Sequence, residues 1–168
     1  VMLTHTGAVY VCGSNANGQL GLPGVPRCLS PERVKALKKM RALDIAASGV
    51  HTVVQIAGDA VYTFGRNFGQ LGHPPGDELQ ESPRAVAFFS DGRHRITGIS
   101  AGLEVTAVTT AAGPVILLRQ YTTNRMQGPP SRLPSSIAGS KGRGRVALTR
   151  VFCGKRSTIV ALDASGCA

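Results

Sequence analysis

The feature that most constrains this chain is a glycine-rich string that occurs twice. Residues 9–21 read VYVCGSNANGQLG, and residues 61–72, which start 52 positions later, read VYTFGRNFGQLG. In each copy β-forming residues lead to a glycine and an asparagine and then to Gly-Gln-Leu-Gly, which predicts a strand that runs into a tight turn. A motif that recurs at a fixed step indicates a repeat architecture, in which each unit buries its apolar face against its neighbours.

Further markers keep nearly the same step. Ser-Pro pairs begin at Ser30 and Ser82, and we expect an outer strand that starts after each proline, with a short helical turn as the alternative. A second strand family with an internal glycine begins near residues 45, 99 and 151. The sequence therefore predicts one domain over residues 1–168, with approximate repeats 7–58, 59–112 and 113–165 and with both chain ends inside repeats.

The recurring glycines and polar residues are expected to shape the turns that define each repeat. Such turns need residues that accept unusual backbone angles or that bond to the backbone through a side-chain amide. The expected structural positions are Gly13, Asn15, Gly18, Gln19, Leu20, Gly21, Gly65, Asn67, Gly69, Gln70, Leu71, Gly72, Gly49, Gly102 and Gly154.

The third repeat keeps the frame, lacks the signature and concentrates the positive charge. Residues 119–156 contain nine basic side chains and no acidic one, in a chain whose formal net charge is +10. Such a block is either a solvated loop or a surface that contacts a polyanion through its cations. The candidate polyanion-binding or partner-binding residues are Arg119, Arg125, Arg132, Lys141, Arg143, Arg145, Arg150, Lys155 and Arg156.

The sequence offers no enzyme signature. It has no phosphate-binding glycine loop before a helix, no paired carboxylates in an apolar setting, and no nucleophile with a base at a recognisable spacing. Its four cysteines show no C-x-x-C spacing and its histidines lack metal-ligand spacing, so we expect no catalytic residues, no metal and no cofactor. No apolar run approaches the roughly 20 residues of a membrane span, and no membrane insertion is expected.

These motifs resemble the repeats of the regulator of chromosome condensation family. The resemblance is carried by the strings at residues 9–21 and 61–72 and by Ala-Ser-Gly-x-His-Thr at residues 47–52. It implies an all-β fold, a β-propeller of four-stranded blades, with about three blades here as part of a seven-bladed ring. In the family a His-Thr pair packs within the blade, so His51 is expected to be structural. The family usually has an aromatic residue before the first motif glycine, where this chain has Cys12 and Phe64.

The leading functional hypothesis is a non-catalytic propeller scaffold or interaction module in a larger assembly. Its basic segment would contact RNA or an acidic partner surface, and an organellar ribosome or another ribonucleoprotein would suit an isoelectric point near 10.2. The family suggests two alternatives, a guanine-nucleotide exchange factor for a small GTPase and a chromatin or microtubule adaptor, and DNA stays open as a partner. Cysteine usage indicates a reducing intracellular compartment, with a mitochondrial or other organellar location preferred over a nuclear, cytoplasmic or ciliary one.

Overall fold

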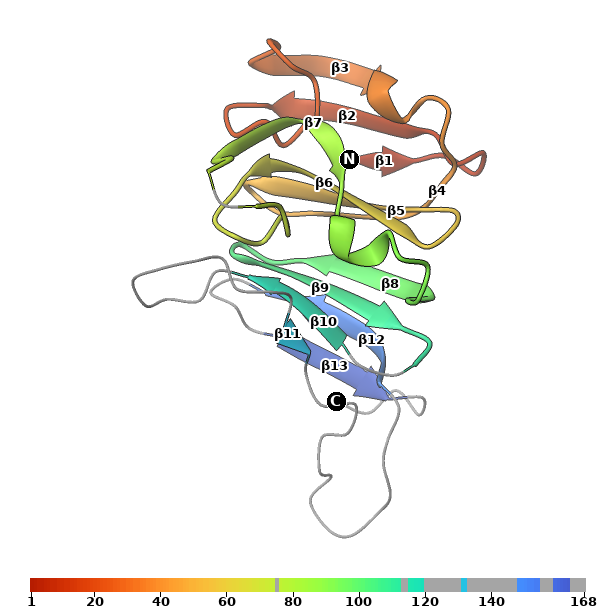
Figure 1. Ribbon diagram of the computed structural model, residues 1–168. Helices are drawn as coiled ribbons and strands as arrows, with labels where there is room; N and C mark the ends of the chain where they lie inside the picture. Colours follow the sequence, from red (N-terminus) through yellow and green to blue (C-terminus); the bar gives the residue numbers. More distant parts are fainter. Residues whose placement is uncertain (75, 113–114, 120–130, 133–147, 155–158, 164–168) are drawn as a thin grey trace, which may run out of the picture.

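The chain folds into a stack of antiparallel sheets in the computed structural model, which describes residues 1–74, 76–112, 115–119, 131–132, 148–154 and 159–163. Figure 1 shows the sheets following one another from the N-terminal strands to the C-terminal ones. A three-stranded sheet comes first, two four-stranded sheets follow, and a two-stranded sheet comes last. The strands are β1 (Met2–Leu3), β2 (Val9–Ser14), β3 (Arg27–Arg33), β4 (Ala42–Ala47), β5 (His51–Ile56), β6 (Ala60–Arg66), β7 (Leu79–Ala85), β8 (Ile96–Ala101), β9 (Val105–Thr110), β10 (Val115–Arg119), β11 (Ser131–Arg132), β12 (Leu148–Cys153) and β13 (Ile159–Asp163).

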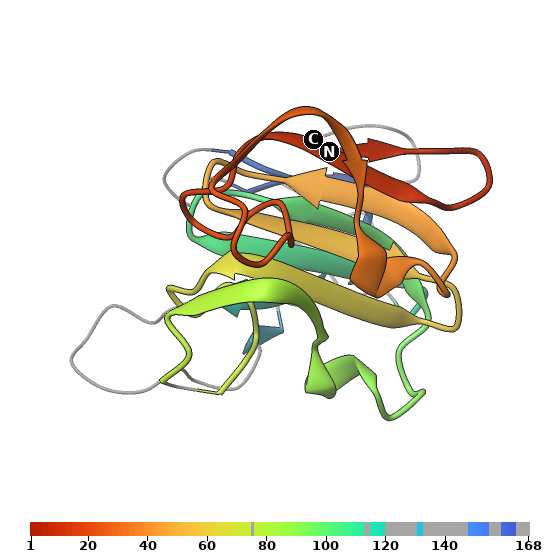
Figure 2. The same cartoon turned by 90° about the horizontal axis from the view of Figure 1, so that it is seen from above.

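Each sheet is a blade of a partial β-propeller, which confirms the expected all-β fold of about three blades. Strands β4–β7 form one complete blade and β8–β11 the next, each paired in sequence order. We call them blade 2 and blade 3; β1–β3 belong to blade 1 and β12–β13 to blade 4. The first strands of blades 2, 3 and 4, which are β4, β8 and β12, are neighbours across the blades. Figure 2 shows the sheets layered one behind another.

One 52-residue period does not correspond to one blade. Residues 7–58 supply β2 and β3 of blade 1 and then β4 and β5 of blade 2, and residues 59–112 repeat this division between blades 2 and 3. Each period therefore links the outer half of one sheet to the inner half of the next.

The Ser-Pro segments differ from the expectation in one respect. The outer strands β3 and β7 do not start after proline but contain Pro31 and Pro83 within them. Proline is tolerated there because these strands lie at sheet edges, where a missing N–H breaks no ladder. The short helical turn also occurs, as the 3-10 turns η1 (Lys35–Leu37) and η2 (Ala87–Phe89), which follow the two strands at the same offset.

Two of the signature glycines lie on strands instead of in turns. Gly13 belongs to β2 and Gly65 to β6, and each follows a shift in the register with the outer strand. The chain backbone passes very close to Gly65, where a Cβ would collide with the Val50 carbonyl oxygen and would meet the His51 Cα at 2.6 Å. Glycine is therefore required at this position by the approach of β5.

The apolar core lies between consecutive blades. Val9, Val11, Leu20 and Val34 of blade 1 share a cluster with Phe64 of blade 2. A second cluster joins blade 2 to blade 3 and a third joins blade 3 to Val151 of blade 4. Burial of each blade face thus depends on its neighbour.

The first signature loop is held by its own amides. The buried Asn15 donates from Nδ2 to the carbonyl oxygens of Leu22 and Val25 at 2.9 and 2.6 Å, and its Oδ1 accepts the Leu20 N–H at 2.8 Å. The Gln19 Oε1 accepts the Asn17 N–H at 2.8 Å. These bonds satisfy backbone groups that a tight loop leaves without partners in a ladder.

The second signature loop repeats this arrangement. Asn67 donates to the Asp77 carbonyl oxygen at 2.9 Å and accepts the Gly69 N–H at 2.9 Å. The fully buried Gln70 accepts the Phe68 N–H at 2.6 Å and donates to the Arg66 carbonyl oxygen at 2.8 Å. The Asn and Gln of the motif therefore have the same structural role in both copies.

The last glycine of each signature packs on the following blade. A Cβ on Gly21 would meet the Phe64 ring at 2.9 Å, and a Cβ on Gly72 would meet Leu118 at 2.9 Å and Val86 at 3.0 Å. Phe64 and Leu118 hold corresponding places in blades 2 and 3. Both glycines also have positive φ angles, 67° and 70°, which other residues rarely adopt.

The substitution Gly21→Ala should destabilise the fold more than Gly24→Ala. Both glycines have similar positive φ angles, but no atom lies within 4 Å of a Cβ on Gly24. We expect a loss of about 1 kcal/mol in the free energy of unfolding for Gly24→Ala, from backbone strain alone, and of about 2–4 kcal/mol for Gly21→Ala. Urea unfolding of both variants measures the difference, and equal losses would contradict the proposed contact between the loop and blade 2.

Candidate interaction site

The structure describes only part of the predicted basic segment. Arg119 and Arg132 are placed on the backbone of β10 and β11, and Arg150 is an exposed side chain of β12. The other predicted cations lie outside the described residues; they are Arg125, Lys141, Arg143, Arg145, Lys155 and Arg156. Arg150 is therefore the member of the set whose surroundings can be described.

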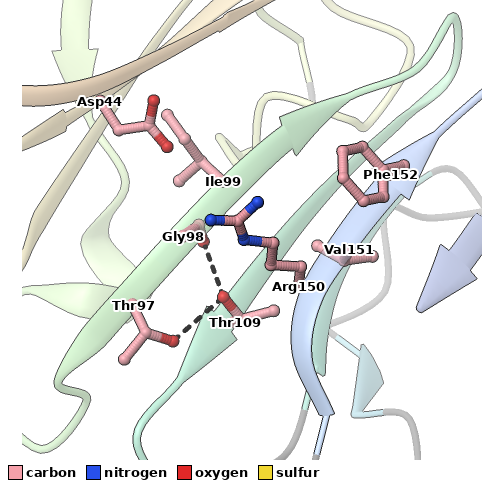
Figure 3. A pocket seen from close by; sticks show the side chains of 8 residues that line it. All are labelled: Asp44, Thr97, Gly98, Ile99, Thr109, Arg150, Val151 and Phe152. Atoms are coloured by element: carbon pink, nitrogen blue, oxygen red, sulfur yellow. Dashed lines mark hydrogen bonds between the residues drawn. The ribbon is translucent and has the colours of Figure 1, made fainter. Parts of the chain in front are cut away.

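Arg150 faces a cavity of about 300 Å³ between the first strands of three blades. Figure 3 shows its side chain reaching from β12 over Gly98 of β8, toward the side where Asp44 of β4 lies. Thr109 donates to the Gly98 carbonyl oxygen at 3.3 Å and accepts from the Thr97 hydroxyl at 3.1 Å. Ile99, Val151 and Phe152 complete the lining.

A repeated irregularity in the sheets places the charged residues of this cavity. The pairing of the first two strands shifts register between Ala42 and Asp44 in blade 2, between Ile96 and Gly98 in blade 3, and between Leu148 and Arg150 in blade 4. Such bulges redirect the side chains beside them. Asp44, Gly98 and Arg150 thus hold one position in three blades, so the cavity has an anion on one side, a cation on the other and no side chain between them.

A second groove, of about 340 Å³, lies at the opposite ends of the same strands. The three recurrent glycines predicted from the sequence all line it, since each comes one or two residues after the first strand of blade 2, 3 or 4. A Cβ on Gly102 would meet the Gly154 carbonyl oxygen at 2.9 Å, so the backbones of blades 3 and 4 approach each other closely at these glycines. The groove is lined by Ser48, Gly49, Ala101, Gly102, Leu103, Cys153 and Gly154.

The described cysteines differ in burial. Cys28 is buried, Cys153 is half-buried, and Cys12 is exposed on β2. Burial raises the pKa of the Cys153 thiol above its ordinary value, and a neutral thiol is a poor nucleophile.

A second cationic stretch, at residues 27–41, was missed by the sequence reasoning. It contains all six basic residues of the first 64 positions and only one acidic residue, Glu32. The net charge of the first 64 residues is only +3, because Asp44 and Asp59 add to Glu32, and this sum hides the concentration of the cations. A charge count in a shorter window would have found it. All six side chains are exposed except Arg33, which is half-buried.

Two histidines with shifted pKa values are structural. His51 is fully buried, with Nδ1 2.8 Å from the Ser48 hydroxyl oxygen and Nε2 2.9 Å from the Thr106 hydroxyl oxygen of blade 3. Burial lowers the pKa of His51 to about 4. His73 lies 2.9 Å from the Thr63 hydroxyl, and burial lowers its pKa too. Both rings are enclosed within or between blades, as expected for His51, and offer no accessible base.

The described ranges contain no gathering of three or more His, Cys, Asp or Glu side chains that could hold a metal ion. No helix within those ranges has the length and apolar character needed to cross a membrane. The helical elements found there are the two single turns η1 and η2.

Repeated four-stranded blades, whose signature loops pack on the next blade, define a repeat β-propeller protein. The chain matches the family model described as the regulator of chromosome condensation (RCC1) repeat over residues 6–55 and 59–109. The chain therefore belongs to the RCC1 repeat family, as the sequence motifs predicted.

Curated relatives are similar over part of the chain. The inhibitor of Bruton tyrosine kinase from Xenopus laevis is 36% identical over 132 residues, which cover 75% of this chain and 10% of that protein. A bovine protein named secretion-regulating guanine nucleotide exchange factor is 32% identical over 115 residues, which cover 68% of this chain and 24% of that protein. The chain thus spans about a tenth of the first relative and a quarter of the second.

Solved structures share the fold. Human WBSCR16 superposes with a TM-score of 0.81 at 23% identity, over 97% of this chain and 42% of that one. Prp20p from Saccharomyces cerevisiae superposes with a TM-score of 0.75 at 16% identity, over 98% of this chain and 41% of that one. At these identities the likeness establishes the propeller fold.

Stability should fall as the pH drops through the titration range of His51. The pKa of this histidine is about 4 in the folded chain against an ordinary value of 6.5, so below about 6.5 the unfolded chain gains a proton that the folded chain does not. The loss grows to about 3 kcal/mol as the pH approaches 4.

Urea unfolding from neutral pH down to about pH 5 tests this before carboxylates titrate extensively. The variant His51→Gln should remove most of the pH dependence, and the remainder belongs to His73. His5→Gln is the matched control, because His5 is exposed. The prediction fails if wild type and His51→Gln lose stability in parallel.

Proposed function

We propose that this chain is a non-catalytic interaction module, a rigid propeller segment that presents surfaces to a partner in a larger assembly. The observation that supports this most directly is the use of its motif residues: Asn15, Gln19, Asn67 and Gln70 bond to loop backbone, and His51 bonds across a blade boundary. The residues with chemical potential therefore hold blades and loops in place. We therefore expect charged surface residues to provide the contact with a partner.

The partner contact of this proposal is the basic segment at residues 119–156, and the partner is an acidic protein surface. Arg150 supports it, because its exposed guanidinium has no ion-pair partner among the described residues. An arginine can bind a carboxylate through two parallel hydrogen bonds. RNA offers phosphates to the same cations, and it is the competing outcome of the test.

Joint substitution of Arg143→Gln, Arg145→Gln, Arg150→Gln and Lys155→Gln should weaken binding of an acidic polyglutamate peptide by about tenfold or more, with a shallower dependence on salt. Fluorescence anisotropy against ionic strength measures both quantities. A variant with Arg93→Gln and Arg95→Gln serves as the control, because it removes exposed cations from another blade. Unchanged affinity and salt dependence would exclude the segment as the contact, and preference for an oligouridylate would assign it to RNA.

A second candidate is guanine-nucleotide exchange on a small GTPase. It is favoured by the similarity to the bovine relative that is named as an exchange factor. An exchange factor needs no catalytic side chain of its own, because it acts by stabilising the nucleotide-free GTPase, so the absence of an enzyme signature does not oppose it.

The exchange hypothesis predicts faster release of labelled GDP from a cognate GTPase when the chain is added as part of its full-length protein. The measurement is the fluorescence decay of a labelled nucleotide across a panel of small GTPases, with each GTPase alone as the control. Absence of acceleration across the panel would leave the interaction module without exchange activity.

A further inference from the structure

A group of cations lies on and around the turn η1 of blade 1, and all of them are exposed except the half-buried Arg33. We call this group the η1 patch, and it consists of Arg33, Lys35, Lys38, Lys39 and Arg41. The turn is anchored to the core, because the side chains of Val34 and Leu37 are buried and only 1% and 4% exposed. Arg33 also donates from its guanidinium to the Lys38 carbonyl oxygen at 3.3 Å, which ties the strand end to the turn. The positive charge therefore sits on an anchored element.

The repeat supplies an internal reference for this patch. Blade 2 has the same strand, the same proline and the same helical turn 52 residues later, with Val86 and Phe89 buried in place of Val34 and Leu37. Four members of the patch lose their charge or reverse it there: Arg33, Lys35, Lys38 and Lys39 correspond to Ala85, Ala87, Ser90 and Asp91. The fold therefore does not require cations at these positions, and their presence in blade 1 calls for a different explanation.

The two turns also differ in how their charges are compensated. In blade 2, Arg84 pairs with Asp77 at 2.6 Å and Arg93 with Asp91 at 3.7 Å. No member of the η1 patch has an ion-pair partner within the described part of the chain. Uncompensated like charges repel one another, so their concentration has a cost in the free chain that a bound polyanion would remove.

The surroundings favour a protein partner over a nucleic acid. The strand that leads into the turn exposes Leu29 to 82%, where blade 2 has Glu81. An apolar side chain gains from contact with a protein segment and gains little from a phosphate backbone. The residues of the patch and of β3 include no aromatic side chain on which a base could stack.

We propose that the η1 patch is a docking surface for an acidic segment of a partner protein, with its carboxylates on the lysines and arginines of the turn and an apolar side chain at Leu29. Lys35 begins the 3-10 turn and Lys38 caps its end three residues later with helical backbone angles, so their side chains project in a similar direction. This surface is separate from the basic segment at residues 119–156, and it extends the proposed interaction role to a second site.

The test exchanges the patch for the residues that the same turn carries in blade 2. The variant Lys35→Ala, Lys38→Ser, Lys39→Asp should fold normally for that reason, and its thermal unfolding checks this. It should bind an oligoglutamate peptide that contains leucine about tenfold more weakly than wild type. The variant with Arg93→Gln and Arg95→Gln is the matched control, and it should bind like wild type.

Carbodiimide cross-linking locates the bound peptide, because it joins a peptide carboxylate to a lysine amine in contact with it. The chain has five lysines, three in the η1 patch and two, Lys141 and Lys155, in the basic segment. Adducts should form on Lys35, Lys38 and Lys39, in addition to any that form on Lys141 and Lys155 at the first site. Unchanged affinity of the exchanged variant, adducts confined to Lys141 and Lys155, or tighter binding of an oligouridylate of equal charge would each overturn the proposal. Adducts on the η1 lysines that persist when Arg143, Arg145, Arg150 and Lys155 are substituted would separate this site from the first.

Discussion

The packing of each Gly-Gln-Leu-Gly loop on the following blade is the contact on which the rest of the structure depends. Gly21 lies against the Phe64 ring and Gly72 lies against Leu118, so the loop of one sheet covers the middle of the next. Hydrogen bonds continue the connection: the Thr52 hydroxyl donates to the Gln19 carbonyl oxygen at 2.7 Å. No blade buries both of its faces by itself, and the loops fix the spacing at which neighbours can do so.

The sequence was sufficient to predict the fold because its repeated motifs resemble those of a known family and each local signal agreed with the architecture that the family implies. The two signature strings, the Ser-Pro pairs and the buried strands recur at one step, and the structure gives equivalent places to them. The division of the period between blades could not be predicted in the same way. A period in a sequence does not show at which residue a structural unit begins. Strand pairing decides this, because β4 pairs with β5 while β3 lies at the edge of blade 1.

The candidate sites were less predictable, for a physical reason. Charge is a surface property that the fold tolerates in many patterns, so composition found the longest basic block without acids, at residues 119–156, and missed the shorter η1 patch. The cavity beside Arg150 required the structure, because Asp44, Gly98 and Arg150 are far apart in the chain and meet only through bulges at equivalent places in three blades. The role of His51 was predictable in kind, but its bond to Thr106 of another blade was not.

The offset between the sequence repeat and the blade has a consequence for folding. Each boundary between blades 1, 2 and 3 is crossed by a continuous stretch of chain that supplies strands to both sides. When one blade unfolds, two of its strands belong to a repeat whose other two strands lie in the next blade. Unfolding at one blade boundary therefore tends to spread to the next boundary. Blades connected in this way should unfold as one cooperative unit and not independently of one another. Duplication or loss of one 52-residue period would leave every sheet with its full number of strands.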